Sequence, residues 1–233
     1  MLETARKEPN LTEAAYSTLR ADLLACRLPP GQKLSIASLA SDLGVSLGAI
    51  REALSRLTAE GLVTSSTNKG FRAAPVSESE LLDLTSTRIE METACLRRST
   101  RLGGVDWETR IVASHHRMSR IPERATDDPR RINDLWAEAH REFHAALVSA
   151  CDSPWRMRLR EFLYDQTERY RRLSVPALPE ERDLAAEHMA LMEAALARDE
   201  YLVCKLLSQH INITAGRVRA LADPSSQNPG AKT

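Results

Sequence analysis

The hydrophobic positions between Leu34 and Val63 form two short blocks at helical spacing, with a glycine between them. The first block ends at Gly44, which suits a turn with positive φ, and Ser46 is a good N-cap for the second block, which begins near Leu47. The apolar residues of the two blocks are Ile36, Leu39, Ala40 and Leu43, then Ile50, Ala53, Leu54 and Leu57. This pattern predicts a helix-turn-helix that reads DNA, with an ordinary helical hairpin as the alternative.

The residues on either side of this window complete a small domain. Val63 opens a β-prone run, residues 65–70 form a polar turn, and Phe71 to Ala74 return as a second strand. A further amphipathic helix is expected from Thr12 to Cys26. Residues 1–76 are therefore predicted to form a winged helix-turn-helix of three helices and a β-hairpin wing.

The rest of the chain is predicted to be helical almost throughout. Short breaks at Gly, Pro and Ser residues separate six helices, so an antiparallel all-α bundle is expected over residues 77–223. A polar tail of residues 224–233 is expected to be disordered. The predicted helices are Leu81–Arg101, Trp107–Ser119, Pro129–Ala150, Pro154–Leu173, Glu180–Ala197 and Asp199–Leu221.

The order of motifs in the first domain resembles the GntR family of bacterial transcription regulators. The residues that carry the resemblance are residues 28–34 (LPPGQKL), Leu39-Ala40 before Gly44-Val45-Ser46, residues 51–54 (REAL) and residues 60–63 (EGLV). Many members have Arg-Thr directly after the serine of the turn, whereas this chain has Leu47-Gly48. An arginine there would reach a guanine edge, so the base-reading pattern is expected to differ. Leu47 either contacts a thymine methyl group or packs, and packing is the favoured reading.

The formal net charge is zero, and the first 76 residues have only a small excess of basic residues. Affinity for double-stranded DNA is therefore expected to depend on a local face and on a homodimer that binds a pseudo-palindromic operator. For each basic residue, a solvated surface charge is the alternative. The expected contacts are Lys33, Ser46, Leu47, Arg51, Arg56, Lys69 and Gly70, with Arg72 on the same basic face.

Four histidines of the bundle have matched spacing. His140 and His144 lie four residues apart, on one face of a helix. His188 and His210 would be about 33 Å apart on one straight helix, but a reversal near residues 198–200 places them level with each other. A lone histidine is usually a core residue. Four that converge predict a metal site with all four as ligands.

This spacing is similar to the FCD effector domain of the FadR subfamily of GntR regulators, in which an aspartate usually stands where this chain has His140. The resemblance implies a divalent metal ion. The exchange of aspartate for histidine favours zinc over magnesium or manganese, with nickel or another transition metal as alternatives. His140, His144, residues 151–153 and residues 169–171 also resemble a branch of carbon-starvation repressors that responds to glutarate.

FCD relatives generally bind small organic acids, so the resemblance implies a carboxylate effector, with glutarate as a lead. A cation with an open position beside an arginine makes a carboxylate trap. Arg88 is the expected arginine, and its alternative is an intrahelical pair with Glu92. Tyr164 and Arg169 are further candidates for effector binding. The homodimer is expected to act as a repressor, with an activator as the less favoured alternative.

Other function classes are weaker. The sequence HREFH differs from the HExxH motif of zinc proteases because Glu142 is two residues after the first histidine, which turns its carboxylate by about 100°. A metal-dependent hydrolase is therefore disfavoured, and the expectation is that the chain is no enzyme. A purely structural metal is the other alternative. His115 and His116 are expected on an exposed helix surface.

The cysteine content and the apolar runs indicate in which compartment the protein is expected. The chain has four widely spaced cysteines without a CxxC motif, so reduced, buried thiols are expected rather than disulfides. No apolar run approaches the roughly 20 residues that span a bilayer, and no signal peptide is evident. A cytoplasmic location without membrane contact is therefore expected.

Overall fold

The structure is a computed structural model, and it describes residues 11–66, 70–174 and 182–222. These residues are mainly α-helical, as predicted, and form two compact units that meet between Val76 and Ser77. We call residues up to Val76 the DNA-binding unit and those from Ser77 the effector unit. The predicted tail from residue 224 lies outside the described residues.

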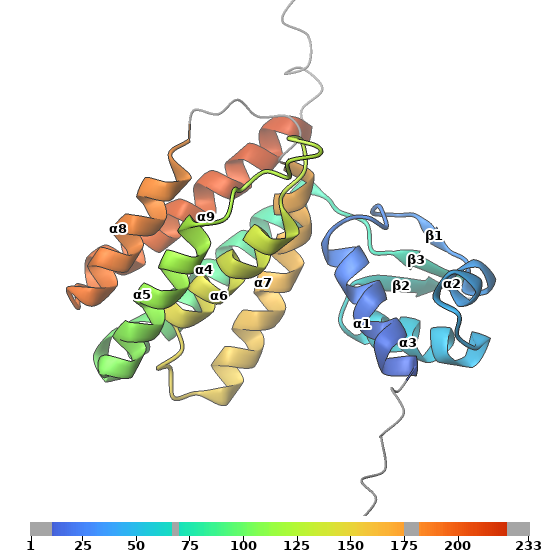
Figure 1. Cartoon of the computed structure of the whole chain (residues 1–233), viewed down its shortest axis with the longest axis horizontal. Coiled ribbons are helices and arrows are strands. Elements are labelled where there is room, and N and C mark those ends of the chain that lie inside the picture. Colours follow the sequence, from blue (N-terminus) through green and yellow to red (C-terminus); the bar gives the residue numbers. More distant parts are fainter. Residues whose placement is uncertain (1–10, 67–69, 175–181, 223–233) are drawn as a thin grey trace, which may run out of the picture. The chain divides into compact units, whose positions relative to one another are not determined.

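The DNA-binding unit consists of three helices and a three-stranded antiparallel sheet (Figure 1). The helices are α1 (Leu11–Leu24), α2 (Ile36–Leu43) and α3 (Leu47–Ala59), and the strands are β1 (Lys33–Leu34), β2 (Val63–Ser66) and β3 (Gly70–Ala73). The sheet order is β1-β3-β2, so the predicted hairpin wing of β2 and β3 is confirmed. The short strand β1 was not predicted; it pairs Lys33 with Arg72 and Leu34 with Phe71.

The turn between α2 and α3 forms as the sequence predicts. Gly44 has a φ of 64°, and its N–H donates to carbonyls of the last turn of α2. The Ser46 side chain accepts a hydrogen bond from the Ala49 N–H at 3.2 Å, which satisfies an otherwise unpaired donor at the start of α3. Ile50, Ala53, Leu54 and Leu57 are completely buried against α1 and α2. The predicted apolar stripe of α3 therefore forms the core of this unit.

The effector unit is a bundle of helices packed side by side (Figure 1). They are α4 (Glu78–Leu102), α5 (Val105–Ser119), α6 (Asp134–Leu147), α7 (Pro154–Ser174), α8 (Leu184–Leu196) and α9 (Glu200–Ala222). Helix α4 contacts α7 and α9, and α5 contacts α6 and α8. The reversal predicted between α8 and α9 occurs at Arg198, which has a φ of 58°. Among the described residues, no helix has the length and apolar character that crossing a bilayer requires.

The sequence predictions for this bundle are wrong at two helix starts and at one histidine. The helix predicted from Glu180 begins only at Leu184, where Asp183 is the N-cap. The helix predicted from Pro129 begins only at Asp134, because the side chain of Asn133 caps it by accepting a hydrogen bond from the Leu135 N–H. Residues before the cap fold into a turn closed by a bridge between Arg124 and Ile132. His115, expected on the surface, is buried, and its ring packs edge-on against Phe143 at 5.5 Å. The adjacent His116 is exposed, as expected.

Candidate metal centre and effector pocket

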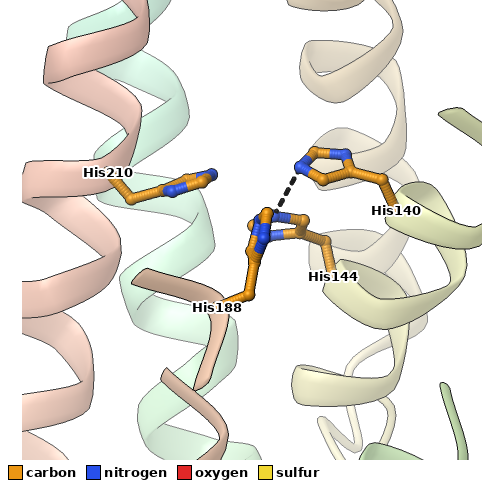
Figure 2. A group of neighbouring side chains, drawn as sticks. All are labelled: His140, His144, His188 and His210. Carbon is orange, nitrogen blue, oxygen red and sulfur yellow. Dashed lines mark hydrogen bonds between the residues drawn. The ribbon is translucent and has the colours of Figure 1, made fainter. Parts of the chain in front are cut away.

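The four matched histidines meet in the interior of the bundle. His140 and His144 project from α6, His188 from α8 and His210 from α9 (Figure 2). One ring nitrogen of each histidine lies within 4.8 Å of those of the other three, and each residue is at most 6% exposed. Phe143, Leu147, Leu191, Leu207 and Ile211 are buried with them in one hydrophobic cluster. The hairpin spacing of the sequence thus predicts the observed convergence of α8 and α9.

Two of the imidazoles are oriented by hydrogen bonds on the side away from the cluster. Nδ1 of His140 lies 3.0 Å from the Tyr164 hydroxyl, and Nδ1 of His210 lies 2.8 Å from Oε2 of Glu187. With its proton on Nδ1, His210 donates to the Glu187 carboxylate and keeps the lone pair of Nε2 for a ligand. Glu187 is held in turn by Arg182, with Nε to Oε1 at 2.6 Å. Such outer partners fix the orientation of metal-binding histidines.

The cluster favours uncharged imidazoles. Burial lowers the pKa values of His140, His144 and His188 well below the ordinary value, and the neighbouring histidines lower them further. Burial also lowers the pKa of His210, although its hydrogen bond with Glu187 opposes the shift. Neutral imidazole is the form that binds a metal ion.

The donor set fits a transition-metal ion. Nε2 of His140 and Nε2 of His144 lie 3.1 Å apart, close to the roughly 3.3 Å between neighbouring ligands of zinc with Zn–N bonds of about 2.0–2.1 Å. Among the described residues, Nε2 of His188 is buried and has no hydrogen-bond partner. A buried nitrogen lone pair without a partner is costly unless something binds it. Four imidazoles are ligands for zinc, nickel or copper rather than for magnesium.

A small cavity adjoins the histidine cluster and shares His140 and His210 with it. Its water-accessible volume is about 30 Å³. Helices α4, α6, α7 and α9 supply the lining, which combines apolar, hydroxyl and charged groups. The lining residues are Leu81, Thr85, Arg88, His140, Tyr164, Thr167, Glu168, Tyr170, Arg171, His210, Ile211, Thr214 and Ala215.

Arg88, the arginine expected to bind the effector, lines this cavity. Its side chain is 12% exposed, and its Nη1 donates to the Thr167 hydroxyl at 2.7 Å. Its Nε also lies 3.4 Å from Oε1 of Glu92, so the intrahelical pair and the cavity position occur together. Burial lowers the pKa of Arg88 despite the neighbouring carboxylate. Glu92 also accepts a hydrogen bond from Arg160, which is 3% exposed. One buried carboxylate therefore serves two guanidinium groups.

Tyr164, the second residue expected to bind the effector, lies among three arginines. Its ring is 2% exposed, and the guanidinium carbons of three arginines lie 4.6 to 4.9 Å from the ring centroid. They belong to Arg88, Arg141 and Arg160. Cation–π contacts of this kind favour a fixed placement of the positive charges. The same tyrosine thus contacts both the arginines and His140.

Arg169, the third expected residue, is buried but is not among the described residues that line the cavity. Arg171 lines it instead, beside Glu168. Burial raises the pKa of Glu168, but Arg171 and Arg172 outweigh this effect and hold the pKa below its usual value. The sequence pattern Arg-Tyr-Arg indicated the region. Only the helical phase of α7, with Tyr164, Thr167 and Arg171 on one face, could have selected the right arginine.

The expected DNA contacts of the first unit differ in their surroundings. Arg51 and Leu47 are both exposed on α3. Because Leu47 is 48% exposed, the prediction that it packs into the core is wrong. Ser46 caps α3, and Lys33 and Gly70 lie exposed on β1 and at the start of β3. Lys69 lies outside the described residues. These placements leave one polar face of α3 accessible.

Arg56 has partners within its own unit. Its Nη1 donates to Oε2 of Glu13 at 2.7 Å, and its guanidinium carbon lies 3.7 Å from the ring centroid of Tyr16. Both partners belong to α1. Arg72 donates in a similar way to the carbonyl oxygen of Gly31 at 2.9 Å. Among the described residues, Arg51 is thus the arginine of α3 without a hydrogen bond or ion pair of this kind.

Comparisons with known proteins agree with this two-unit organisation. Residues 11–72 match the family described as bacterial regulatory proteins, gntR family, and residues 83–213 match the FCD domain. The chain is 43% identical to the HTH-type transcriptional regulator BphR of Paraburkholderia xenovorans over 90% of this chain and 86% of that protein. The chain belongs to the GntR family of bacterial regulators.

A second relative and a solved structure extend the comparison. The HTH-type transcriptional repressor GlaR of Escherichia coli is 36% identical over 84% of this chain and 90% of its own length. The solved structure of E. coli McbR/YncC superposes with a TM-score of 0.76 at 19% identity, covering 92% of this chain and all of that one. The chain is therefore a transcriptional regulator with an FCD domain, and the expectation that it is no enzyme is confirmed.

Proposed function

We propose that this GntR regulator is a homodimeric repressor whose affinity for its operator is controlled by a small organic acid bound beside a metal ion. The proposal is supported by two residues that belong to both sites. His140 and His210 are members of the histidine cluster and also line the cavity that contains Arg88. A carboxylate in this cavity can therefore contact a metal-bound site and a guanidinium group at once.

The charges around the cavity favour an anion. Arg88 and Arg160 share the single carboxylate of Glu92, so this buried group carries one more positive than negative charge. Arg171 adds a guanidinium to the lining, balanced by Glu168. A dicarboxylate would place one end near the histidines and the other near the arginines, where charge-assisted hydrogen bonds are strong. Glutarate is the specific candidate, which the resemblance of residues 140, 144, 151–153 and 169–171 suggests.

The residues that would hold the metal are His140, His144, His188 and His210. When bound, a zinc or nickel ion would supply a positive charge that attracts a carboxylate oxygen. The residues around the ion would each have a separate role. Tyr164 and Glu187 orient the imidazoles, the apolar residues around them exclude water, and Arg88 binds the acid. A purely structural ion is the competing function of the same cluster.

On the DNA side, α3 would enter the major groove, with Arg51 and Leu47 toward the bases and Lys33, Lys69 and the start of β3 near the phosphates. Base contacts specify a site, while phosphate contacts position the protein. One such unit reads a half-site, so a homodimer on a pseudo-palindromic operator is expected.

A thermal-shift screen tests the proposal. Zinc-loaded full-length protein is mixed with mono- and dicarboxylates of two to six carbons, with and without a chelator. The expected result is a rise of the melting temperature with one acid, and its loss on chelation. Metal-dependent stabilisation without a response to any acid would instead indicate a structural ion.

A further inference from the structure

The hydroxyl of Tyr170 connects the cavity wall with the start of α4. Tyr170 is 4% exposed and lines the cavity. Its hydroxyl accepts a hydrogen bond from the backbone N–H of Ser77 at 3.2 Å and donates one to Oε2 of Glu80 at 2.5 Å. Ser77 directly follows Val76, the last residue of the DNA-binding unit. One side chain thus contacts the cavity and the residue at which the two units join.

The same hydroxyl closes the N-terminal cap of α4. Ser77 is the N-cap residue, and its Oγ accepts a hydrogen bond from the Glu80 N–H at 3.2 Å. Tyr170 therefore binds the backbone of the cap at Ser77 and the side chain of Glu80 one turn later. Burial and the hydrogen bond to Glu80 raise the pKa of Tyr170 to about 12, so the hydroxyl keeps its proton at neutral pH.

The size of the cavity makes this contact sensitive to a ligand. Its volume of about 30 Å³ has room for only a few water molecules, whereas pockets for small organic ligands usually enclose several hundred Å³. An acid of several carbons can enter only if part of the lining moves. Arg88 is held by Thr167 and Glu92 within the bundle. The hydroxyl of Tyr170 is held by a backbone N–H and by the exposed Glu80, and water can replace both contacts.

We propose that Tyr170 transmits the occupancy of the cavity to the junction between the two units. An acid that enlarges the cavity displaces the Tyr170 ring, breaks its hydrogen bonds to Ser77 and Glu80, and loosens the start of α4. Because the Val76–Ser77 peptide bond joins the units, loosening Ser77 changes the orientations that the DNA-binding unit can adopt. This inference rests on the proposed function, since it requires an acid in the cavity.

The test compares four full-length, zinc-loaded proteins: wild type, Tyr170→Phe, Glu80→Ala and the control Tyr201→Phe. Tyr170→Phe removes only the hydroxyl, Glu80→Ala removes its acceptor from an exposed position, and Tyr201 is 77% exposed. Three readouts are measured with and without glutarate: the thermal shift, amide hydrogen exchange of residues 77–81, and affinity for a DNA duplex that the wild type selects from a random pool.

The expected result separates binding from response. Without glutarate, Tyr170→Phe and Glu80→Ala exchange faster at residues 77–81 than wild type. Because the acid no longer has to break these hydrogen bonds, their thermal shift with glutarate is at least as large as that of wild type, but glutarate changes their DNA affinity less than about 2-fold, compared with at least about 5-fold for wild type and Tyr201→Phe. Wild-type protection and wild-type response in Tyr170→Phe would overturn the inference.

Failure of the proposed function gives a different pattern. If wild type neither binds glutarate nor responds to it, the proposed effector is wrong. The contact is then judged by hydrogen exchange and by DNA affinity without an acid. Unchanged values of both in Tyr170→Phe and Glu80→Ala would overturn the role of Tyr170 independently of the effector.

Discussion

The Tyr164 hydroxyl lies 3.0 Å from Nδ1 of His140, which joins the arginine cluster of the cavity to the histidine cluster. The guanidinium groups of Arg88, Arg141 and Arg160 lie close to the ring of Tyr164. The hydroxyl therefore orients a ligand of the proposed metal, and the ring positions the charges that would bind the acid.

Replacing Tyr164 with phenylalanine should separate these two roles. The variant keeps the ring and its cation–π contacts but loses the hydrogen bond to His140, so zinc affinity should fall about 10- to 100-fold. Competition with a chromophoric chelator measures this change. Tyr201→Phe serves as the control, because Tyr201 is exposed. Equal zinc affinities of Tyr164→Phe and wild type would argue against a metal held by His140.

A leucine in place of His188 should abolish the metal response without weakening the metal-free fold. Nε2 of His188 is buried without a partner among the described residues, and an apolar side chain removes that cost. The metal-free melting temperature should equal or exceed that of wild type, while the rise on adding zinc disappears. His116→Leu, on the exposed face of α5, is the control. A full rise with zinc in His188→Leu would exclude His188 as a ligand.

Replacing Arg51 should affect DNA binding, whereas replacing Arg56 should affect stability. Arg51→Ala should weaken DNA binding by about 1–3 kcal/mol with an unchanged melting temperature, because Arg51 is exposed on α3. Arg56→Ala should mainly lower the melting temperature, because it removes the contacts with Glu13 and Tyr16. Electrophoretic mobility shifts and calorimetry measure the two effects, with Arg110→Ala on α5 as the control. The opposite assignment of the two effects would contradict the proposed DNA face.

Alkaline pH should remove the stabilisation that comes from the Tyr170 hydroxyl. The folded-state pKa of about 12 lies above the ordinary value of 10.0, so the folded protein binds the proton more tightly than the unfolded chain. The contribution is fully present below pH 10 and is lost as the pH rises toward 12. In urea titrations, the stability difference between wild type and Tyr170→Phe should therefore shrink over this range. A constant difference from pH 9 to 12 would contradict the hydrogen bond to Glu80.

The sequence predicts this fold well where spacing and caps act together. Gly44 and Ser46 define the turn between α2 and α3, and the equal distances of His188 and His210 from the reversal bring them level. It fails where partners are distant in the chain. Strand β1 exists because residues 33 and 34 pair with residues 71 and 72, and two residues carry no strand pattern of their own.

The residues that line the cavity could also be predicted only in part from the sequence. The pattern of residues 169–171 indicated a functional segment of α7, but it could not show that Arg171 rather than Arg169 lines the cavity. That choice depends on how α7 packs against α4 and α9. The burial of His115 likewise depends on Phe143, a residue of another helix. Single-sequence patterns identify such helices but not which neighbouring helix covers each face.

Whether an acid in the cavity controls DNA binding is tested by the operator affinity of the zinc-loaded protein, measured by fluorescence anisotropy with and without glutarate, for wild type and for Arg88→Ala. Glutarate should weaken the operator binding of wild type at least about 5-fold, and chelation or the Arg88 substitution should remove this effect. Identical affinities with and without glutarate, and with every other dicarboxylate of two to six carbons, would contradict the claim that this cavity controls DNA binding.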